Sequence, residues 1–335
     1  MQGLLAKLLE SAQQSAEPLK RAAEPLKRGW RVLVVDGTGF SMPDTPELLA
    51  HFGMPPRQQP GVGYPVGKVM AMLDLATGML VRTLALPLFT HDMRGVAAIH
   101  PFLRAGDVLV GDRAFCSVLH IMQLSGRSIH CLFRLHQRRK NPQPGAGRWK
   151  RPKACPVWMD KATLKALPAW LGVRIIHHVI EHKGYRTRVL YLATTLPAAW
   201  SDDEVRALYR RRWEIETCFG HLKTGMKMNV LKCRSVEGVI KELTVYLLVY
   251  NLVRLLMLRW ARQAQADARR VSFIDACRLL TAWLMGLPGC ARLIVNPDRQ
   301  GRAQLRRVRR RPKKYPLLKA ARATYTLPEN QRKTA

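Results

Sequence analysis

Short apolar segments with strand patterns recur along the first third of the chain. Residues 31–40 (RVLVVDGTGF) contain an uninterrupted apolar run, which predicts a buried strand ending at its aspartate. Residues 66–75 and 79–88 have strand patterns separated by ATG, which predicts a β-hairpin. Residues 107–115 (DVLVGDRAF) repeat the first pattern and predict another strand that ends in an aspartate.

Helical spacing of apolar residues recurs later in the chain. It is found in residues 91–103, 117–127, 201–223, 238–265 and 272–286. Strand patterns occupy residues 128–135, 173–182 and 187–196. This order predicts an α/β fold in which a mixed sheet is flanked by helices, giving three layers. We expect a β-rich insertion at 137–197, with its strands outside the main sheet and a basic loop at 137–153 that is exposed and mobile.

The composition adds a large positive charge to this picture. The 335 residues include 56 Lys and Arg against 23 Asp and Glu, a formal net charge of +33. Such an excess indicates a polyanionic partner, and nucleic acid is the usual one. A basic protein that binds phosphate without specificity, in a ribosomal or chromatin-like role, is the alternative.

Other classes are disfavoured by the cysteines and by the apolar segments. The seven cysteines are scattered without a C-x-x-C pair, which argues against a disulfide framework and a structural zinc site. The most apolar stretch, residues 243–258, is interrupted by Asn251 and Arg254 and predicts a packed helix, not a membrane span. With no signal peptide visible, we expect a cytoplasmic protein.

Asp36 and Asp112 share a local pattern, since each follows an apolar strand segment (VLVVD and VLVGD). A carboxylate after four apolar residues carries a desolvation cost unless it lies at a strand end or binds a cation. Two ordinary explanations remain open. Asp36 could begin a D-G hairpin turn, and Asp112 could pair with Arg113.

The helix predicted for residues 201–223 begins with the N-cap residue Ser201 and carries a polar stripe. At about 100° per residue, the stripe is about 60° wide. Its members are Tyr209, Arg212, Glu216 and Lys223. Glu214 points elsewhere, about 140° from Tyr209. The alternative explanation of the stripe is a surface helix with an i, i+4 salt bridge between Arg212 and Glu216.

Two strand-end aspartates and a helical glutamate are the donors that a two-metal phosphoryl-transfer site needs. Divalent cations of this class prefer carboxylate oxygens, and paired ions clamp the attacking and leaving oxygens of a phosphodiester. Basic residues next to such a site would hold the DNA backbone.

The motifs together resemble one family. The ungapped Y-(2)-R-(3)-E-(6)-K spacing from Tyr209 to Lys223 resembles the signature of the DDE transposases of bacterial insertion sequences, in the group named after insertion sequence four. DGT at 36–38 and GDRAF at 111–115 are similar to that group's two aspartate motifs. The long interval between Asp112 and Glu216 is similar to its β-strand insertion. The resemblance covers about residues 30–290 and implies a ribonuclease-H-like core.

The resemblance also implies a site and a reaction. The catalytic, metal-binding residues would be Asp36, Asp112 and Glu216, holding two Mg²⁺ ions for which Mn²⁺ can substitute. The residues that position DNA phosphates would be Tyr209, Arg212 and Lys223. Trp213 would either stack on an unpaired base or pack internally. The implied chemistry is hydrolysis at transposon ends, followed by attack of the freed 3′-hydroxyl on target DNA.

The implied partners are double-stranded DNA, both transposon ends and target, and a second copy of the chain when two ends are synapsed. The implied location is the bacterial cytoplasm, in association with the nucleoid. Two rival functions remain: a truncated, inactive copy that acts only as a basic DNA-binding protein, and a nuclease with the same core.

The expected organisation divides the chain into five parts. They are a linker or remnant of an N-terminal region at 1–30, the first part of the catalytic core at 31–136, the β-rich insertion at 137–197, the second part of the core with C-terminal helices at 198–290, and a basic tail at 291–335. Members of the family usually carry a substantial DNA-binding region before the first aspartate. Only 35 residues precede Asp36, so recognition of the DNA ends is left unassigned.

Overall fold

A computed structural model provides the three-dimensional structure. It describes residues 7, 10–11, 30–56, 61–136, 139, 142–179, 189–287, 293–297, 318–321 and 324–325. The predicted linker at 1–30 and the basic tail at 291–335 lie mostly outside these residues.

An eight-stranded mixed sheet forms the centre of the described chain, with the order β3-β2-β1-β4-β5-β8-β7-β6. The strands are β1 (Val32–Ser41), β2 (Val66–Asp74), β3 (Leu80–Pro87), β4 (Val108–Gly111), β5 (His130–Arg134), β6 (Gly145–Lys150), β7 (Trp170–Val179) and β8 (Val189–Thr194). β1, β4 and β5 are parallel to one another, and every other neighbouring pair is antiparallel.

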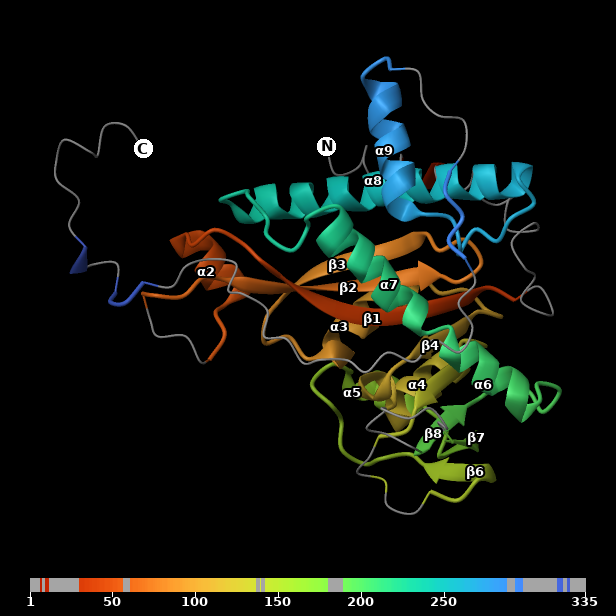
Figure 1. The fold of residues 1–335 in the computed structure, drawn as a ribbon. Helices are drawn as coiled ribbons and strands as arrows, with labels where there is room; N and C mark the ends of the chain where they lie inside the picture. Colours follow the sequence, from red (N-terminus) through yellow and green to blue (C-terminus); the bar gives the residue numbers. More distant parts are fainter. Residues whose placement is uncertain are drawn as a thin grey trace.

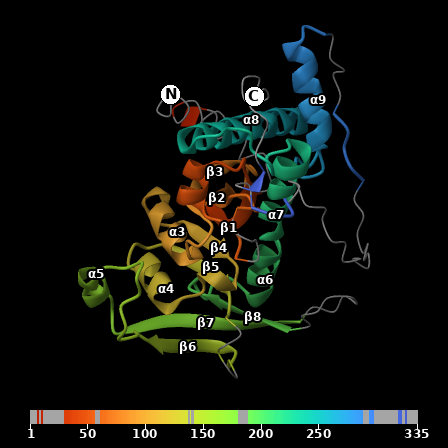
Figure 2. The same cartoon turned by 90° about the vertical axis from the view of Figure 1, so that its left-hand side faces the viewer.

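Helices cover both faces of the sheet (Figures 1 and 2). They are α2 (Pro46–Phe52), α3 (Asp92–Ile99), α4 (Val118–Ser125), α5 (Lys161–Ala166), α6 (Asp202–Arg210), α7 (Trp213–Gly220), α8 (Val236–Gln263) and α9 (Phe273–Leu284). Short 3₁₀ segments lie at η1 (His100–Phe102) and η2 (Arg113–Phe115), and a π-helical turn, η3 (His221–Gly225), extends α7.

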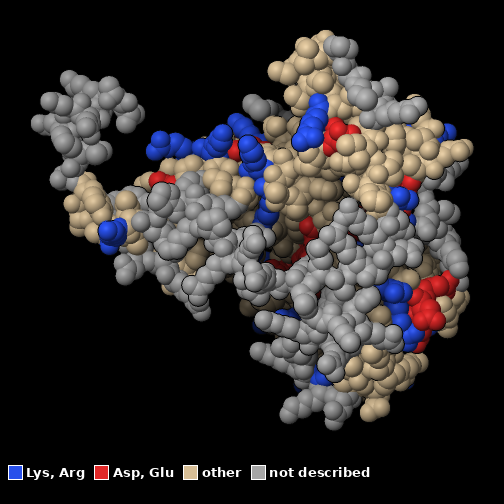
Figure 3. Space-filling view, in the orientation of Figure 1, with Lys and Arg blue, Asp and Glu red and all other residues tan. Residues whose placement is uncertain are grey.

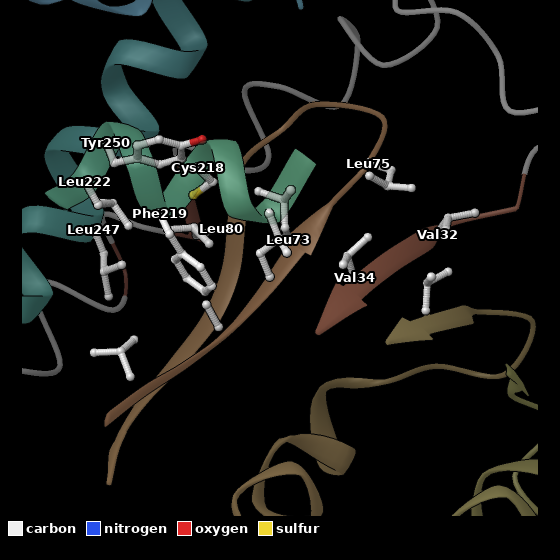
Figure 4. Close-up of a cluster of buried hydrophobic side chains, with 14 of the residues drawn as sticks. Val32, Val34, Leu73, Leu75, Leu80, Cys218, Phe219, Leu222, Leu247 and Tyr250 are labelled. Carbon is white, nitrogen blue, oxygen red and sulfur yellow. The ribbon is translucent and has the colours of Figure 1, made fainter. Parts of the chain in front are cut away.

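Two hydrophobic cores explain the apolar run at the start of β1. Val32 and Val34 face the core formed with α2 and α6–α9, part of which is drawn in Figure 4. Leu33 and Val35 face the core formed with α3 and α4. Because successive side chains of a strand point to opposite faces, a strand buried on both faces is apolar throughout.

The predicted three-layer α/β architecture is therefore confirmed. The hairpin of β2 and β3 lies on one side of β1, and the parallel strands β4 and β5 lie on its other side. With helices on both faces, this core has the ribonuclease-H-like arrangement expected above.

The first strand is longer than predicted. β1 does not end at Asp36 but continues to Ser41, because β2 pairs with it from Asp74 back to Val66. Asp36 is paired with Ala71 in the middle of this ladder. The alternative interpretation of Asp36 as part of a D-G hairpin turn is therefore wrong.

The strands of the predicted insertion are not outside the main sheet, which corrects the expectation. β8 pairs with β5, β7 with β8, and β6 with β7, all antiparallel. Without β8, the edge of β5 that faces away from β4 would present unpaired backbone N–H and C=O groups. Pairing with β8 satisfies these groups. Part of the predicted 137–153 loop forms the exposed edge strand β6, while residues 137–138 and 140–141 lie outside the described residues.

The helix predicted for 201–223 begins as expected but is divided. Ser201 and Glu204 form a reciprocal capping box at its start. The amides of Arg211 and Arg212 bond three residues back, to Leu208 and Tyr209, and a turn separates α6 from α7. The predicted stripe is consequently spread over α6, the turn that contains Arg212, α7 and the π-helical turn η3.

Helix α8 contains the most apolar stretch of the sequence. Its two polar interruptions, Asn251 and Arg254, hydrogen-bond backbone groups of the β2–β3 hairpin. The amide of buried Asn251 donates to the Leu80 carbonyl and its oxygen accepts from the Leu80 N–H, both at 2.9 Å. Arg254 donates to the Thr77 carbonyl at 2.9 Å. None of the helices in the described part of the chain is long and apolar enough to cross a membrane.

Replacing Asn251 with alanine is expected to lower the free energy of unfolding by about 2–4 kcal/mol. Each of the two backbone groups of Leu80 would lose its buried partner, at about 1–3 kcal/mol per group. Leu252→Ala, at the exposed neighbouring position, is the control and should cost less than about 1 kcal/mol. Denaturant unfolding measures both, and equal losses would contradict the role assigned to Asn251.

Candidate active site

Asp36 and Asp112 lie at equivalent positions on neighbouring parallel strands. The last pair in register between β1 and β4 joins Val34 to Val110. Each aspartate follows its member of that pair by two residues. Because the two strands run in the same direction, both carboxylates lie toward the same end of the strand pair, and the negative charge of Asp112 contributes to raising the pKa of Asp36.

The turn that carries Asp112 is held by two features. Asp112 caps η2 by accepting from the Ala114 N–H at 2.7 Å. Below it, His120 Nδ1 lies 2.8 Å from the Phe115 carbonyl, and His120 Nε2 lies 3.0 Å from His100 Nε2. A carbonyl only accepts, so His120 Nδ1 donates and His120 Nε2 accepts from His100. Burial lowers the pKa of His100 to about 3 and that of His120 to about 4, which keeps this pair neutral.

Sequence reasoning did not identify the histidine pair. Its members are 20 residues apart, on segments whose apolar spacing indicates ordinary helices. The only sequence signal for this pair was that each of these two segments has a histidine at a position expected to face the core.

Glu216 projects from α7 above the sheet. Ile215 and Phe219 anchor this helix in the core that also contains Val34. The Glu216 side chain is 41% exposed, so it lies at the margin of the buried face. Acidic side chains show inside a hollow near the middle of this side of the molecule, with basic side chains above it (Figure 3).

Arg212 connects two of the three carboxylates. Its Nη1 lies 3.5 Å from Asp36 Oδ2, and its Nη2 donates to Glu216 Oε1 at 3.0 Å. The Arg212 side chain is only 10% exposed, and its buried Nε has no partner in the described structure. The salt bridge between Arg212 and Glu216 considered from the sequence exists, but it is joined to a strand-borne aspartate.

Asp36 is the most perturbed carboxyl group of this cluster. Burial raises its pKa to about 6, and the negative charges of Asp112 and Glu216 act in the same direction. The Gly37 N–H, which donates to Asp36 at 2.8 Å, and the charge of Arg212 lower it only in part. A carboxylate in this condition favours a proton or a further cation.

The three carboxylates do not form a ready set of metal ligands. Across the residues that the structure describes, no three Asp, Glu, His or Cys side chains are grouped so that they could hold a metal ion. Arg212 neutralises Asp36 and Glu216 instead. The metal-binding role of Asp36, Asp112 and Glu216 stays a prediction.

The two remaining members of the predicted stripe, Tyr209 and Lys223, and the stacking candidate Trp213 differ in their surroundings. Tyr209 is 6% exposed and packs in the core, and burial raises its pKa to about 12. Trp213 is 46% exposed, with the Arg212 guanidinium 4.9 Å from its ring centroid. Lys223 lies on the π-helical turn and is half-buried. The structure therefore leaves Trp213 accessible and Tyr209 enclosed.

Glu214 points away from the carboxylate cluster, as predicted. It accepts from Arg211 Nε at 2.7 Å, and Arg211 also donates to the Leu75 carbonyl at 2.7 Å. The two glutamates of α7 thus face different surroundings, one next to Asp36 and the other at the end of the β2–β3 hairpin.

A family model and a curated protein that match this chain are both described as transposases. The family described as Transposase DDE domain matches residues 27–252. Transposase InsG for insertion sequence element IS4 of Escherichia coli (strain K12) is 29% identical over 322 residues, which cover 86% of this chain and 70% of that protein.

Among solved structures, the cryo-EM structure of a piggyBac transposase synaptic complex with hairpin DNA has a TM-score of 0.45 and 10% identity. The match covers 76% of this chain, which spans about half (53%) of the length of that protein.

Stability should depend on pH through Asp36. Its pKa is raised in the folded state from 3.8 to about 6, so the folded protein retains a proton that the unfolded chain releases. This contribution is complete below about pH 4 and is lost as the pH rises through about 6, for a total of about 3 kcal/mol. Asp36→Asn should therefore gain stability relative to the parent by up to this amount between about pH 4 and pH 7.

Denaturant unfolding over this pH range tests the expectation. Asp203→Asn, on the exposed first turn of α6, controls for removal of a surface carboxylate. A stability difference between Asp36→Asn and the parent that does not change with pH would contradict the assignment.

Proposed function

Since the chain belongs to the Transposase DDE domain family, we propose that it cleaves phosphodiester bonds at transposon ends and joins the freed 3′-hydroxyl to target DNA. The observation that carries this proposal is the cluster of Asp36 within β1, Asp112 directly after the parallel strand β4, and Glu216 on α7. Within it, burial and the negative charges of Asp112 and Glu216 raise the pKa of Asp36. This arrangement is suited to cations and to the phosphates that they accompany.

The donor chemistry of the cluster fits Mg²⁺, with Mn²⁺ as a substitute. Asp36, Asp112 and Glu216 offer only oxygen donors, which these ions prefer. Two bound divalent ions would supply charge stabilisation for the attacking and leaving oxygens. The capped turn at Asp112 and the ladder at Asp36 would limit the movement of two of these donors.

Arg212, Lys223 and Tyr209 would hold the DNA backbone next to the carboxylates. The fork of Arg212, now on Asp36 and Glu216, has the geometry to pair with phosphate oxygens. Tyr209, being buried next to Arg212, would support that guanidinium from below. Exposed Trp213 would offer a face for stacking on an unpaired base.

The partners that we propose are transposon ends and target DNA, bound by a homodimer when two ends are synapsed. The net charge of +33 supports association with a polyanion. The two alternatives make different predictions: a basic DNA-binding protein would not cleave, and a nuclease would cleave without joining strands.

Glu216→Gln is expected to abolish strand transfer while DNA affinity stays level or rises. Glutamine keeps the shape of the side chain but removes the charge proposed to hold a metal ion, so we expect a loss of at least about 100-fold. The measurement is strand transfer of pre-nicked transposon ends with Mn²⁺, together with DNA binding by fluorescence anisotropy.

Glu214→Gln is the matched control, because Glu214 lies on the same helix but pairs with Arg211. It should keep strand transfer within a few-fold of the parent. Equal yields from Glu216→Gln and the parent, both above background, would show that Glu216 is not catalytic. Cleavage without joining would favour the nuclease.

Arg212→Ala should strengthen Mn²⁺ binding in the absence of DNA. Arg212 now neutralises Asp36 and Glu216, so a metal ion has to compete with it. Removing this competition is expected to lower the Kd for Mn²⁺ by about tenfold, which corresponds to about 1.4 kcal/mol. Isothermal titration calorimetry without DNA measures the change.

Arg210→Ala removes an exposed arginine near the end of α6 and controls for net charge. An equal change in the two variants would attribute the effect to the overall field. Weaker Mn²⁺ binding by Arg212→Ala would contradict the competition.

A further inference from the structure

A second cleft lies on the side of α7 that carries Glu214. It consists of two adjoining cavities, of about 500 and 460 Å³, which share part of their lining. The shared residues are Gly78, Glu214, Arg254 and Arg269. We call this space the Arg254 cleft. Neither Asp36, Asp112 nor Glu216 lines it.

The first cavity of the Arg254 cleft has an excess of positive charge. Its charged lining consists of Arg211, Glu214, Arg254, Arg262, Asp267 and Arg269. Both carboxylates already have partners, since Glu214 pairs with Arg211 and Asp267 pairs with Arg269. Within the described chain, no salt bridge joins Arg254 or Arg262 to a carboxylate. Two arginine charges are therefore available to an anion.

Arg254 is an unusual lining residue, because it is a charged residue that is only 8% exposed. Its guanidinium packs against Gly78, where a Cβ atom would lie 2.4 Å from the nearest Nη. One Nη donates to the Thr77 carbonyl at 2.9 Å, but the buried Nε has no partner in the described structure. A buried guanidinium cannot lose its proton, and a buried charge without a counter-ion is costly.

The second cavity is less polar and contains an aromatic stack. The rings of His221 and Phe273 are 4.2 Å apart and nearly parallel, at 4°. Burial, together with the nearby charge of Arg254, lowers the pKa of His221 to about 4, so the ring is neutral. Its buried Nδ1 also has no partner in the described structure. Met257 and Ile274 extend the apolar wall.

We propose that the Arg254 cleft binds a nucleoside phosphate, with the phosphate on Arg254 and Arg262 and the base toward His221 and Phe273. An anion would balance the Arg254 charge and could accept from its Nε, which has no partner in the described structure, and the edge of a base could satisfy His221 Nδ1. The ligand is either one nucleotide of a DNA strand or a free nucleotide. This site goes beyond the proposed chemistry and does not depend on the carboxylate cluster.

The competing explanation is structural, because Arg254 also ties α8 to the turn between β2 and β3 through Thr77. A purely structural arginine would affect folding without affecting ligand binding. Arg262, which is exposed on the last turn of α8, can be replaced with little risk to the fold. Arg259, exposed on the same helix and absent from the lining of the cleft, is its matched control.

The test uses the full chain without divalent ions, so that binding is measured independently of cleavage. The probes are deoxyadenosine 5′-monophosphate, followed by calorimetry, and a 5′-phosphorylated single-stranded oligonucleotide, followed by anisotropy. Arg262→Gln is expected to weaken binding of at least one probe by about tenfold, as for a lost charge-assisted hydrogen bond. Arg259→Gln should change it less than about twofold. Arg254→Lys, which keeps the charge but not the fork, should also weaken it.

The outcomes separate the two sources of the ligand. Sensitivity of both probes to Arg262→Gln supports a site for free nucleotides, and sensitivity of the oligonucleotide alone supports a nucleotide within a strand. Equal losses of binding affinity in Arg262→Gln and Arg259→Gln would show that only net charge matters, which would overturn the proposal. No effect of Arg262→Gln on either probe would also overturn it. Loss of strand transfer in Glu216→Gln bears on neither result.

Discussion

The parallel pairing of β1 with β4, within a sheet buried on both faces, is the constraint on which the candidate active site depends. Two strands that run in the same direction carry their following residues to the same edge. This register places Asp36 and Asp112 next to each other, although they are far apart in the chain. The helices on both faces then remove water from around Asp36. Burial is consequently the largest cause of its raised pKa.

A cluster of carboxylates in such surroundings has to be neutralised, and Arg212 does so in this structure. It reaches a strand aspartate and a helical glutamate from the short turn between α6 and α7. The same guanidinium is suited to a phosphate. In the function that we propose, Arg212 would leave the carboxylates for DNA phosphates, and metal ions would then balance the carboxylate charge.

Helix α7 has a different role on each of its sides. One side presents Glu216 to the carboxylate cluster, and the other presents Glu214 to the Arg254 cleft. Asn251 and Arg254 on α8 bind the β2–β3 hairpin, which lies next to both sites, through Leu80 and Thr77. The hairpin and the two helices pack in one hydrophobic core, so the cleft and the candidate active site share these elements while differing in the residues that line them.

The sequence by itself determined most of the local elements and indicated the residues of the candidate site. Strand patterns ending in Asp36 and Asp112, the cap at Ser201 and the Tyr209-to-Lys223 spacing need no tertiary information, because they follow from backbone geometry and solvation of neighbouring residues. Tertiary structure decided which elements meet. Periodicity reports that a face is buried but not what covers it. For that reason only the folded chain showed β1 continuing past Asp36, β8 joining β5, Arg212 turning toward Asp36 and Tyr209 being enclosed in the core.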